Sequence, residues 1–278
     1  MTDTERLLAT AARTIDRRDA ELLLAAAASL TRTQLMIGNP VAPDAVARFE
    51  ALVARRRGGE PVAYLLGRRE FWSLELEVGP AVLVPRPETE LLVERALVLV
   101  NAPEASIADL GTGSGAIAIA LAHERPGWRV VATEVSDAAL ALARRNGERL
   151  VAGRVEWRSS DPGGEWYAPL AGQRFDALLS NPPYIAGDDP VLEADGLKFE
   201  PRGALTPEGD GYAALLTLIN GAPGHLLPGG WLALEHGESQ AERLRAALVA
   251  RGFTHVTSHR DLAGRERITE GQISHARF

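Results

Sequence analysis

From Ser106 to the C-terminus, short apolar runs that suit β-strands alternate with segments whose apolar residues recur at helical spacing. Strands are predicted at 106–110, 129–134, 155–159, 175–180 and 230–236, with strand character again at 254–259 and 267–274. Helices are predicted at 114–124, 137–150, 211–226 and 239–251. This alternation predicts an α/β fold in which helices cover both faces of a mostly parallel sheet.

The chain before Ser106 follows a different pattern. Apolar residues recur at helical spacing up to about Arg57, and Pro43 and Gly58-Gly59 are typical of a helix start and a helix end. The alternating run 71–78, followed by the turn pair Gly79-Pro80, predicts a β-hairpin. We therefore expect three parts: a helical domain at 1–66, a hairpin linker at 67–87 and an α/β domain at 88–278.

Composition excludes several classes of function. The chain has no cysteine, so a disulfide framework, a thiolate nucleophile and a cysteine zinc site are excluded. A net charge of −7 argues against a general nucleic-acid binder, which needs a basic surface. His255 and His259 lie in a β-rich segment with no evident third ligand, so no metal site is expected. The apolar stretch 22–30 is too short to span a bilayer and no signal peptide is visible, so we expect a cytoplasmic protein without a membrane partner.

A glycine-rich loop follows the strand predicted at 106–110. Its sequence is Asp109-Leu-Gly111-Thr-Gly113-Ser-Gly115, and Glu134 ends the next predicted strand. Glycines let the backbone turn sharply and let a ligand approach closely, and a carboxylate at the second strand end can accept hydrogen bonds from ribose hydroxyls. The loop therefore predicts an adenosine-containing cofactor. Because the relaxed dinucleotide fingerprint also fits, the loop alone leaves a nicotinamide cofactor open.

A second motif, Asn181-Pro182-Pro183-Tyr184, follows the strand predicted at 175–180. Ligands of open α/β sheets bind at the carboxyl ends of the strands, so Asn181 is expected to face the cofactor. An asparagine side chain and proline carbonyls offer acceptors on a rigid loop, which suits a planar NH₂ group, and a tyrosine offers a flat apolar face. Such a loop can orient a poorly nucleophilic nitrogen for methyl transfer by positioning and electrostatics.

The two motifs together resemble those of amino-group methyltransferases that use S-adenosylmethionine (SAM), which include adenine-N6 DNA enzymes and glutamine-N5 protein enzymes. Five further segments resemble the bacterial release-factor glutamine methyltransferases, the HemK family. They are GEPVAYLLG at 59–67, REFWSL at 69–74, VPRPETE at 84–90, FEPRGAL at 199–205 and LEHG at 234–237. The resemblance therefore runs through nearly the whole chain.

This resemblance implies a Rossmann-like methyltransferase domain with a mostly parallel seven-stranded sheet, and methylation of the glutamine in the Gly-Gly-Gln motif of peptide-chain release factors. It also implies a helical domain that docks the release factor. No nucleic-acid substrate is expected, and a monomer is the default. The implied cofactor-binding residues are Gly111, Thr112, Gly113, Ser114, Gly115, Glu134, Asp161, Pro162 and Asn181. The implied substrate-binding residues are Asn181, Pro182, Pro183, Tyr184, Phe71 and Arg86, with Asn181, Pro182 and Tyr184 as the catalytic group.

One departure concerns Pro162, which stands where the family often carries an aromatic residue beside the adenine, and Trp166 is the nearby substitute. Two enzymatic alternatives stay open at this point. An adenine-N6 DNA or RNA methyltransferase would flip a base into the same loop, although the acidic balance argues against it. A nicotinamide-dependent oxidoreductase would leave the second motif unexplained.

Overall fold

The computed structural model describes residues 3–160 and 165–274. The chain divides into two compact units. One holds the chain up to Arg68 together with Glu193–Phe199, and the other holds Arg69–Leu192 together with the chain from Glu200 onward.

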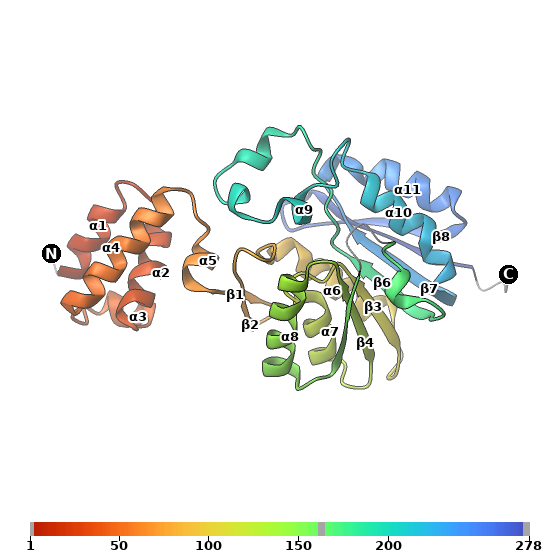
Figure 1. Cartoon of the computed structure of the whole chain (residues 1–278), viewed down its shortest axis with the longest axis horizontal. Helices are drawn as coiled ribbons and strands as arrows, with labels where there is room; N and C mark the ends of the chain where they lie inside the picture. The colour runs from red at the N-terminus through yellow and green to blue at the C-terminus, as the bar shows by residue number, and fades with distance from the viewer. Residues whose placement is uncertain (1–2, 161–164, 275–278) are drawn as a thin grey trace. The chain divides into compact units, whose positions relative to one another are not determined.

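The first unit is helical, as the sequence predicts, and its residues up to Arg68 are drawn in red and orange in Figure 1. Its helices are α1 (Asp3–Ala11), α2 (Arg17–Ala28), α3 (Arg32–Met36), α4 (Pro43–Arg57) and α5 (Val62–Leu66). Leu23, Leu24 and Phe49 are buried at its centre. The helix predicted from Pro43 begins there and is capped by Gly58. The distant segment Glu193–Phe199 joins this unit through a hydrogen bond that the backbone N–H of Gly196 donates to the carbonyl of Gly59 at 3.0 Å.

A β-hairpin is present, but its turn lies earlier than predicted. Strands β1 (Arg68–Phe71) and β2 (Leu74–Glu77) are joined by Trp72 and Ser73, whose φ angles are 53° and 58°. Positive φ at both central residues is the hairpin geometry that continues the twist of the strands. The backbone N–H of Trp72 donates to Glu90 at 2.8 Å, which helps to hold this unusual conformation. Gly79-Pro80 forms a separate turn after β2.

The second unit contains the predicted α/β sheet. Its strands run in the order β5-β4-β3-β6-β7-β9-β8, which makes a seven-stranded sheet. All neighbours from β5 to β7 pair in parallel, and β9 pairs antiparallel with both β7 and β8. The strands are β3 (Ser106–Leu110), β4 (Arg129–Glu134), β5 (Val155–Ser159), β6 (Phe175–Ser180), β7 (Leu226–Glu235), β8 (Phe253–Arg260) and β9 (Glu266–Ile273).

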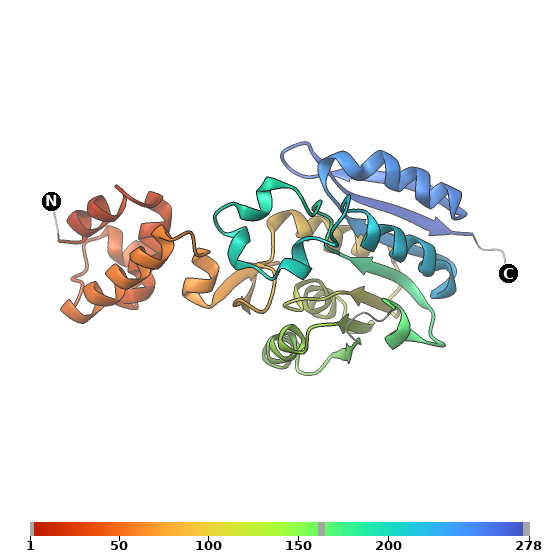
Figure 2. The ribbon, with the colours of Figure 1, turned by 45° about the horizontal axis from the view of Figure 1, so that its top comes forward.

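Helices cover both faces of this sheet. Figure 2 shows α10 and α11 on the opposite side from α7 and α8. The α-helices of this unit are α6 (Glu90–Leu99), α7 (Ala116–Glu124), α8 (Asp137–Val151), α9 (Arg202–Leu205), α10 (Ala213–Gly221) and α11 (Ala241–Ala250). Short 3₁₀ turns lie at η1 (Pro87–Thr89), η2 (Ala168–Leu170), η3 (Pro190–Glu193), η4 (Leu197–Phe199), η5 (Ala222–Gly224) and η6 (Glu238–Gln240).

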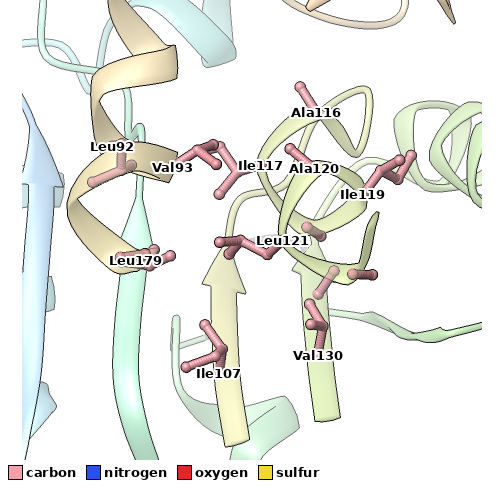
Figure 3. Close-up of a cluster of buried hydrophobic side chains, with 14 of the residues drawn as sticks. Leu92, Val93, Ile107, Ala116, Ile117, Ile119, Ala120, Leu121, Val130 and Leu179 are labelled. Atoms are coloured by element: carbon pink, nitrogen blue, oxygen red, sulfur yellow. The ribbon is translucent and has the colours of Figure 1, made fainter. Parts of the chain in front are cut away.

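Alternate residues of the strands supply two apolar cores. Ile107 of β3 and Leu179 of β6 pack with Ile117 and Leu121 of α7 and with Leu92 of α6, as Figure 3 shows. The neighbouring residues Ala108 and Leu178 belong to the core beneath α10 and α11. A strand that is buried on both faces has a continuous apolar sequence, and this pattern is what predicts these strands.

Strand β7 begins earlier than the sequence indicated, because Pro228-Gly229-Gly230 lies inside it. Pairing with β6 shifts between Phe175 and Ala177, and the irregular stretch accommodates the proline. A Cβ on Gly230 would lie 3.0 Å from the carbonyl oxygens of Leu227 and Phe175, so a side chain there would force the neighbouring backbone to shift. The preceding helix, α10, is correspondingly shorter than predicted.

Candidate functional site

A cavity of about 400 Å³ opens at the carboxyl ends of β3, β4 and β6. Three groups of residues line it: the glycine loop, the ends of strands, and the segments before α6 and around α9. Its lining comprises Ala81, Val82, Leu83, Pro85, Thr89, Gly111, Thr112, Gly113, Ser114, Ala116, Ile117, Thr133, Glu134, Val135, Ser136, Ala139, Ser160, Glu165, Trp166, Asn181, Pro183, Pro201, Gly203 and Ala204. The volume falls in the range of roughly 300–1,000 Å³ that small-molecule sites occupy.

The glycine loop needs glycine for different reasons at different positions. Gly111, Gly113 and Gly115 have φ angles of 73°, 56° and 86°. A Cβ on Gly115 would lie 2.9 Å from both Ile119 and Trp157, so this position is closed by packing. A Cβ on Gly113 would meet nothing within 4 Å, so this position is open, and Gly113 lines the cavity.

Asp109 anchors the loop from inside the protein. Its side chain is fully buried and accepts a hydrogen bond from the hydroxyl of Thr112 at 2.5 Å. Burial raises the pKa of Asp109 to about 7, while the Thr112 hydroxyl and the backbone N–H of Ala118 oppose that rise. The backbone N–H groups of Gly111 and Thr112 both donate to the carbonyl of Thr133 at 2.9 Å, which ties the loop to the end of β4.

Glu134 ends β4 at the cavity. Its Oε2 accepts a hydrogen bond from the backbone N–H of Gly113 at 2.8 Å, and its Oε1 accepts from those of Val135 and Ser136 at 2.9 and 3.0 Å. A carboxylate has about four lone-pair sites, so three backbone donors leave room for roughly one more. The side chain can therefore accept a ligand hydroxyl while it holds the loop.

Asn181 lies next to the end of β6 and lines the same cavity. Its Nδ2 donates to the hydroxyl of Thr89 at 3.2 Å, and among the described residues no partner is recorded for its Oδ1. Pro183 also lines the cavity, whereas Pro182 is buried. The hydroxyl of Ser180 donates to the carbonyl of Leu110 at 2.6 Å and so fixes the end of β6 against the end of β3.

Tyr184 closes this motif and points its hydroxyl toward β7. The hydroxyl donates to Oε1 of Glu235, the last residue of β7, at 3.3 Å. Burial and the neighbouring Glu235 carboxyl raise the pKa of Tyr184. The ring packs against the core beneath α10 and α11 and is not among the cavity-lining residues.

The resemblance also implies that Phe71, Arg86 and the loop at 85–90 line a peptide entrance. The side chains of Phe71 and Arg86 are not among those that line the cavity. Phe71 is 1% exposed and packs in the core around α6 and α7, because it sits on the inward face of β1. Phe71 is therefore not part of the site proposed below. Arg86 forms an ion pair with Glu200, which is itself buried. Its neighbour Pro85 lines the cavity.

Asp161 and Pro162, expected near an adenine, lie outside the described residues. Trp166 lines the cavity, and its ring would lie 3.0 Å from a Cβ placed on Gly111. Thr89 belongs to the loop at 85–90, which the resemblance assigns to the peptide entrance, and it lines the cavity. Glu235, in the segment at 234–237, was not predicted as a site residue. Nothing in the sequence connects Thr89 or Glu235 to Asn181.

Comparison with known proteins identifies the family. The model of the PrmC N-terminal domain matches residues 1–67, and that of the methyltransferase small domain matches residues 87–210. The chain is 49% identical over 269 residues to the release factor glutamine methyltransferase of Xylella fastidiosa, with 96% of each chain covered. The chain belongs to the release factor glutamine methyltransferase family. Relatives with the same name from Pseudomonas aeruginosa and Escherichia coli are 50% and 42% identical, each with 92% of both chains covered.

Solved structures agree with the family on the fold. A methyltransferase from Pyrococcus furiosus matches with a TM-score of 0.55 and 22% identity, covering 81% of this chain and 98% of that one. The hMettl16 catalytic domain in complex with MAT2A 3'UTR hairpin 6 matches with a TM-score of 0.60 and 18% identity, covering 81% and 82%. For this member of the release factor glutamine methyltransferase family, they establish the Rossmann-like methyltransferase fold. Within residues 3–160 and 165–274, no helix has the length and apolar character needed to cross a membrane.

Proposed function

We propose that this chain transfers a methyl group from SAM to the side-chain amide nitrogen (N5) of the glutamine in the Gly-Gly-Gln motif of peptide-chain release factors. The observation that carries the proposal is the placement of Asn181 in the same cavity as the glycine loop and Glu134. The identity to relatives named release factor glutamine methyltransferase supports the choice of substrate.

The cavity has the properties that SAM requires. The lining includes the apolar side chains of Val135, Ile117 and Trp166, which suit a nucleoside base. Glu134 keeps acceptor capacity for a ribose hydroxyl, and the open position at Gly113 leaves room for a ligand against the backbone. When bound, SAM supplies a methyl group on a positively charged sulfur. The thioether that this sulfur becomes is a good leaving group. The resemblance assigns the methionine part to Gly111–Gly115 and the adenine to Asp161 and Pro162.

The chain's own task is to orient the glutamine amide. Amide nitrogen is a poor nucleophile because its lone pair is delocalised into the carbonyl. Asn181 Oδ1 and the Pro182 carbonyl are two acceptors that can take both N–H bonds of the incoming amide, which favours build-up of the lone pair on nitrogen. As the new C–N bond forms, the S–CH₃ bond of the sulfonium would break and release a neutral thioether, and the methylated nitrogen would lose one proton to water. Positioning of the reactants supplies most of the acceleration.

Several parts of the proposal concern the partner. The helical domain expected at 1–66 docks the release factor, and Arg86 and Tyr184 contribute to the substrate side of the site. The protein acts as a monomer in the cytoplasm. Each of these follows from the resemblance and from the soluble character of the sequence, and each stays a prediction.

A methyl-transfer assay with tritiated SAM tests the function. Purified release factor, the same release factor with its Gly-Gly-Gln glutamine replaced by alanine, and unmethylated DNA are offered in parallel. We expect label on the unaltered release factor alone. Label on DNA would favour the adenine-N6 alternative, and equal label on both release factors would place the methyl group elsewhere on the protein.

A further inference from the structure

The adjacent parallel strands β6 and β7 end side by side, and Asn181, which follows β6, lines the cavity. Ser180 of β6 pairs with Leu234 of β7, so Asn181 and Glu235 are the next residues on neighbouring strands. Thr89, at the end of η1, lies beside both of them. Its hydroxyl accepts a hydrogen bond from Asn181 at 3.2 Å and neighbours the Glu235 carboxyl. Thr89 and Glu235 are 4% and 1% exposed, so water does not compete for these groups.

The directions of these hydrogen bonds are set by chemistry. An ionised carboxylate only accepts hydrogen bonds, whereas a hydroxyl donates one and can accept two. Oε1 of Glu235 accepts a hydrogen bond from the Tyr184 hydroxyl, whereas its buried Oε2 has no hydrogen-bond partner among the described residues. The Thr89 hydroxyl neighbours this carboxyl and can supply the missing donor by rotation of its hydrogen. The Thr89 oxygen then remains free to accept from Asn181.

An acceptor at Thr89 can bind only the NH₂ end of the Asn181 amide. The carbonyl end, Oδ1, is then left for the cavity that Asn181 lines. In the reversed orientation the single Thr89 hydrogen would face two acceptors, and the amide would present NH₂ to a substrate that also carries NH₂. The reversed orientation could not hold the substrate amide as the proposed reaction requires.

We propose that Thr89 and Glu235 are positioning residues, which act in sequence to fix the Asn181 side chain with its carbonyl toward the substrate. The inference rests on the proposed function in one respect, because the orientation matters for catalysis only if Asn181 Oδ1 accepts a hydrogen bond from the substrate amide. The orientation itself is a property of the folded chain alone. It can be measured without any turnover.

The first test is activity of Thr89→Val, which keeps the shape of the side chain and removes the hydroxyl. We expect turnover to fall by about 10-fold or more, the size of effect that an unsatisfied buried polar group produces. SAM affinity, measured by calorimetry, should stay near that of the wild type. Thr89→Ser restores the hydroxyl and should recover most of the lost turnover. Thr217→Val, at an exposed position of α10, is the matched control.

The second test reads the orientation directly. The side-chain NH₂ signals of Asn181 are assigned by NMR from their loss in Asn181→Asp. We expect one of the two protons to exchange slowly with solvent in the wild type and in Thr89→Ser, and to lose that protection in Thr89→Val. Because this signal requires no methylation, it separates failure of the inference from failure of the proposed function.

The third test is the pH dependence of turnover. Burial raises the pKa of Glu235 to about 7, opposed by the Thr89 and Tyr184 hydroxyls and by Arg267 of β9 and reinforced by Glu88 of η1. Wild-type turnover should rise as pH increases through that value, because the ionised carboxylate orients Thr89. Asp109 titrates in the same pH range, so the pH profile of the wild type is compared with that of Glu235→Gln. This variant should turn over more slowly, and its turnover should lack the rise with pH that is due to Glu235. Unchanged turnover and unchanged amide protection in Thr89→Val would overturn the inference.

Discussion

Asn181 and Glu134 line one cavity but act on different molecules in this account. Asn181→Ala removes the side-chain acceptor for the substrate amide, an interaction that strengthens as the nitrogen becomes nucleophilic. We expect single-turnover methylation at saturating SAM to slow by about 10²–10³, as when a transition-state hydrogen bond is lost elsewhere. SAM affinity should hardly change. An unaltered rate in this variant would refute the role given to the side chain.

Glu134→Ala should mainly weaken SAM binding, in contrast to Asn181→Ala, which should mainly slow methyl transfer. The carboxylate accepts three backbone hydrogen bonds and offers its remaining capacity to a ligand. Hydrogen bonds to charged groups contribute about 1.5–3 kcal/mol each, so the dissociation constant of SAM should rise roughly 10- to 100-fold. Calorimetry measures it. Normal SAM affinity with lost turnover would mean that Glu134 serves the substrate instead.

Local motifs predicted the glycine loop, Glu134 and Asn181 as candidate site residues, because each stands at a recognisable place in a strand-loop-helix pattern. Thr89 and Glu235 could not be connected to Asn181 in this way, since their proximity depends on which strands pair. Phe71 was expected near the site, but alternation along a strand does not say which face of a hairpin packs inward.

At the scale of elements, the loop between β3 and α7 contains one glycine that packing requires and another that is open to a ligand. Gly115→Ala would press a methyl group against Ile119 and Trp157, so we expect a loss of about 1–3 kcal/mol in the free energy of unfolding. Both substitutions carry the strain of a positive φ, but Gly113→Ala meets no such contact and should lower SAM affinity more than stability. Denaturant unfolding measures the stability of both variants, and calorimetry measures their affinity for SAM. A Gly113→Ala variant that is less stable than Gly115→Ala would contradict this division of roles.

The pattern of strands and helices was predicted well where both faces of an element are buried, as in β3, β4 and α7. Two elements deviated for physical reasons. The hairpin turns at Trp72-Ser73 because contacts with Glu90 and Glu124 support positive φ at residues that rarely adopt it. Strand β7 includes Pro228-Gly229-Gly230, which local rules treat as a break, because pairing with β6 tolerates an irregularity.

At the scale of the whole molecule, Glu235 contributes to the pH dependence of stability. Its folded pKa of about 7 lies above its ordinary value of 4.5, so between these values the folded state holds a proton that the unfolded state releases. This term therefore lowers stability as pH rises from 4.5 to about 7 and is constant above. Glu235→Gln removes the term, so the variant should gain stability relative to the wild type over that window. Urea unfolding at several pH values measures the difference, with Glu238→Gln as the exposed control. A difference independent of pH would contradict it.

The division into two compact units has a feature that no sequence pattern indicated. Glu193–Phe199 belongs with the N-terminal unit although more than a hundred residues of the other unit separate them in the chain. Such an association depends on contacts such as that of Gly196 with Gly59, which local periodicity does not record. The domain limits expected at 66 and 87 stay predictions.

The central claim is that the acceptor groups of one strand-end loop direct a methyl group from SAM onto a glutamine side-chain nitrogen. Tandem mass spectrometry of release-factor peptides, after incubation with enzyme and SAM, tests this claim most directly. We expect a single added methyl group on the peptide that contains Gly-Gly-Gln, located on the glutamine side chain, and none with Asn181→Ala over the same short incubation. A methyl group on another residue, or an unmodified peptide from the active wild-type enzyme, would contradict the account.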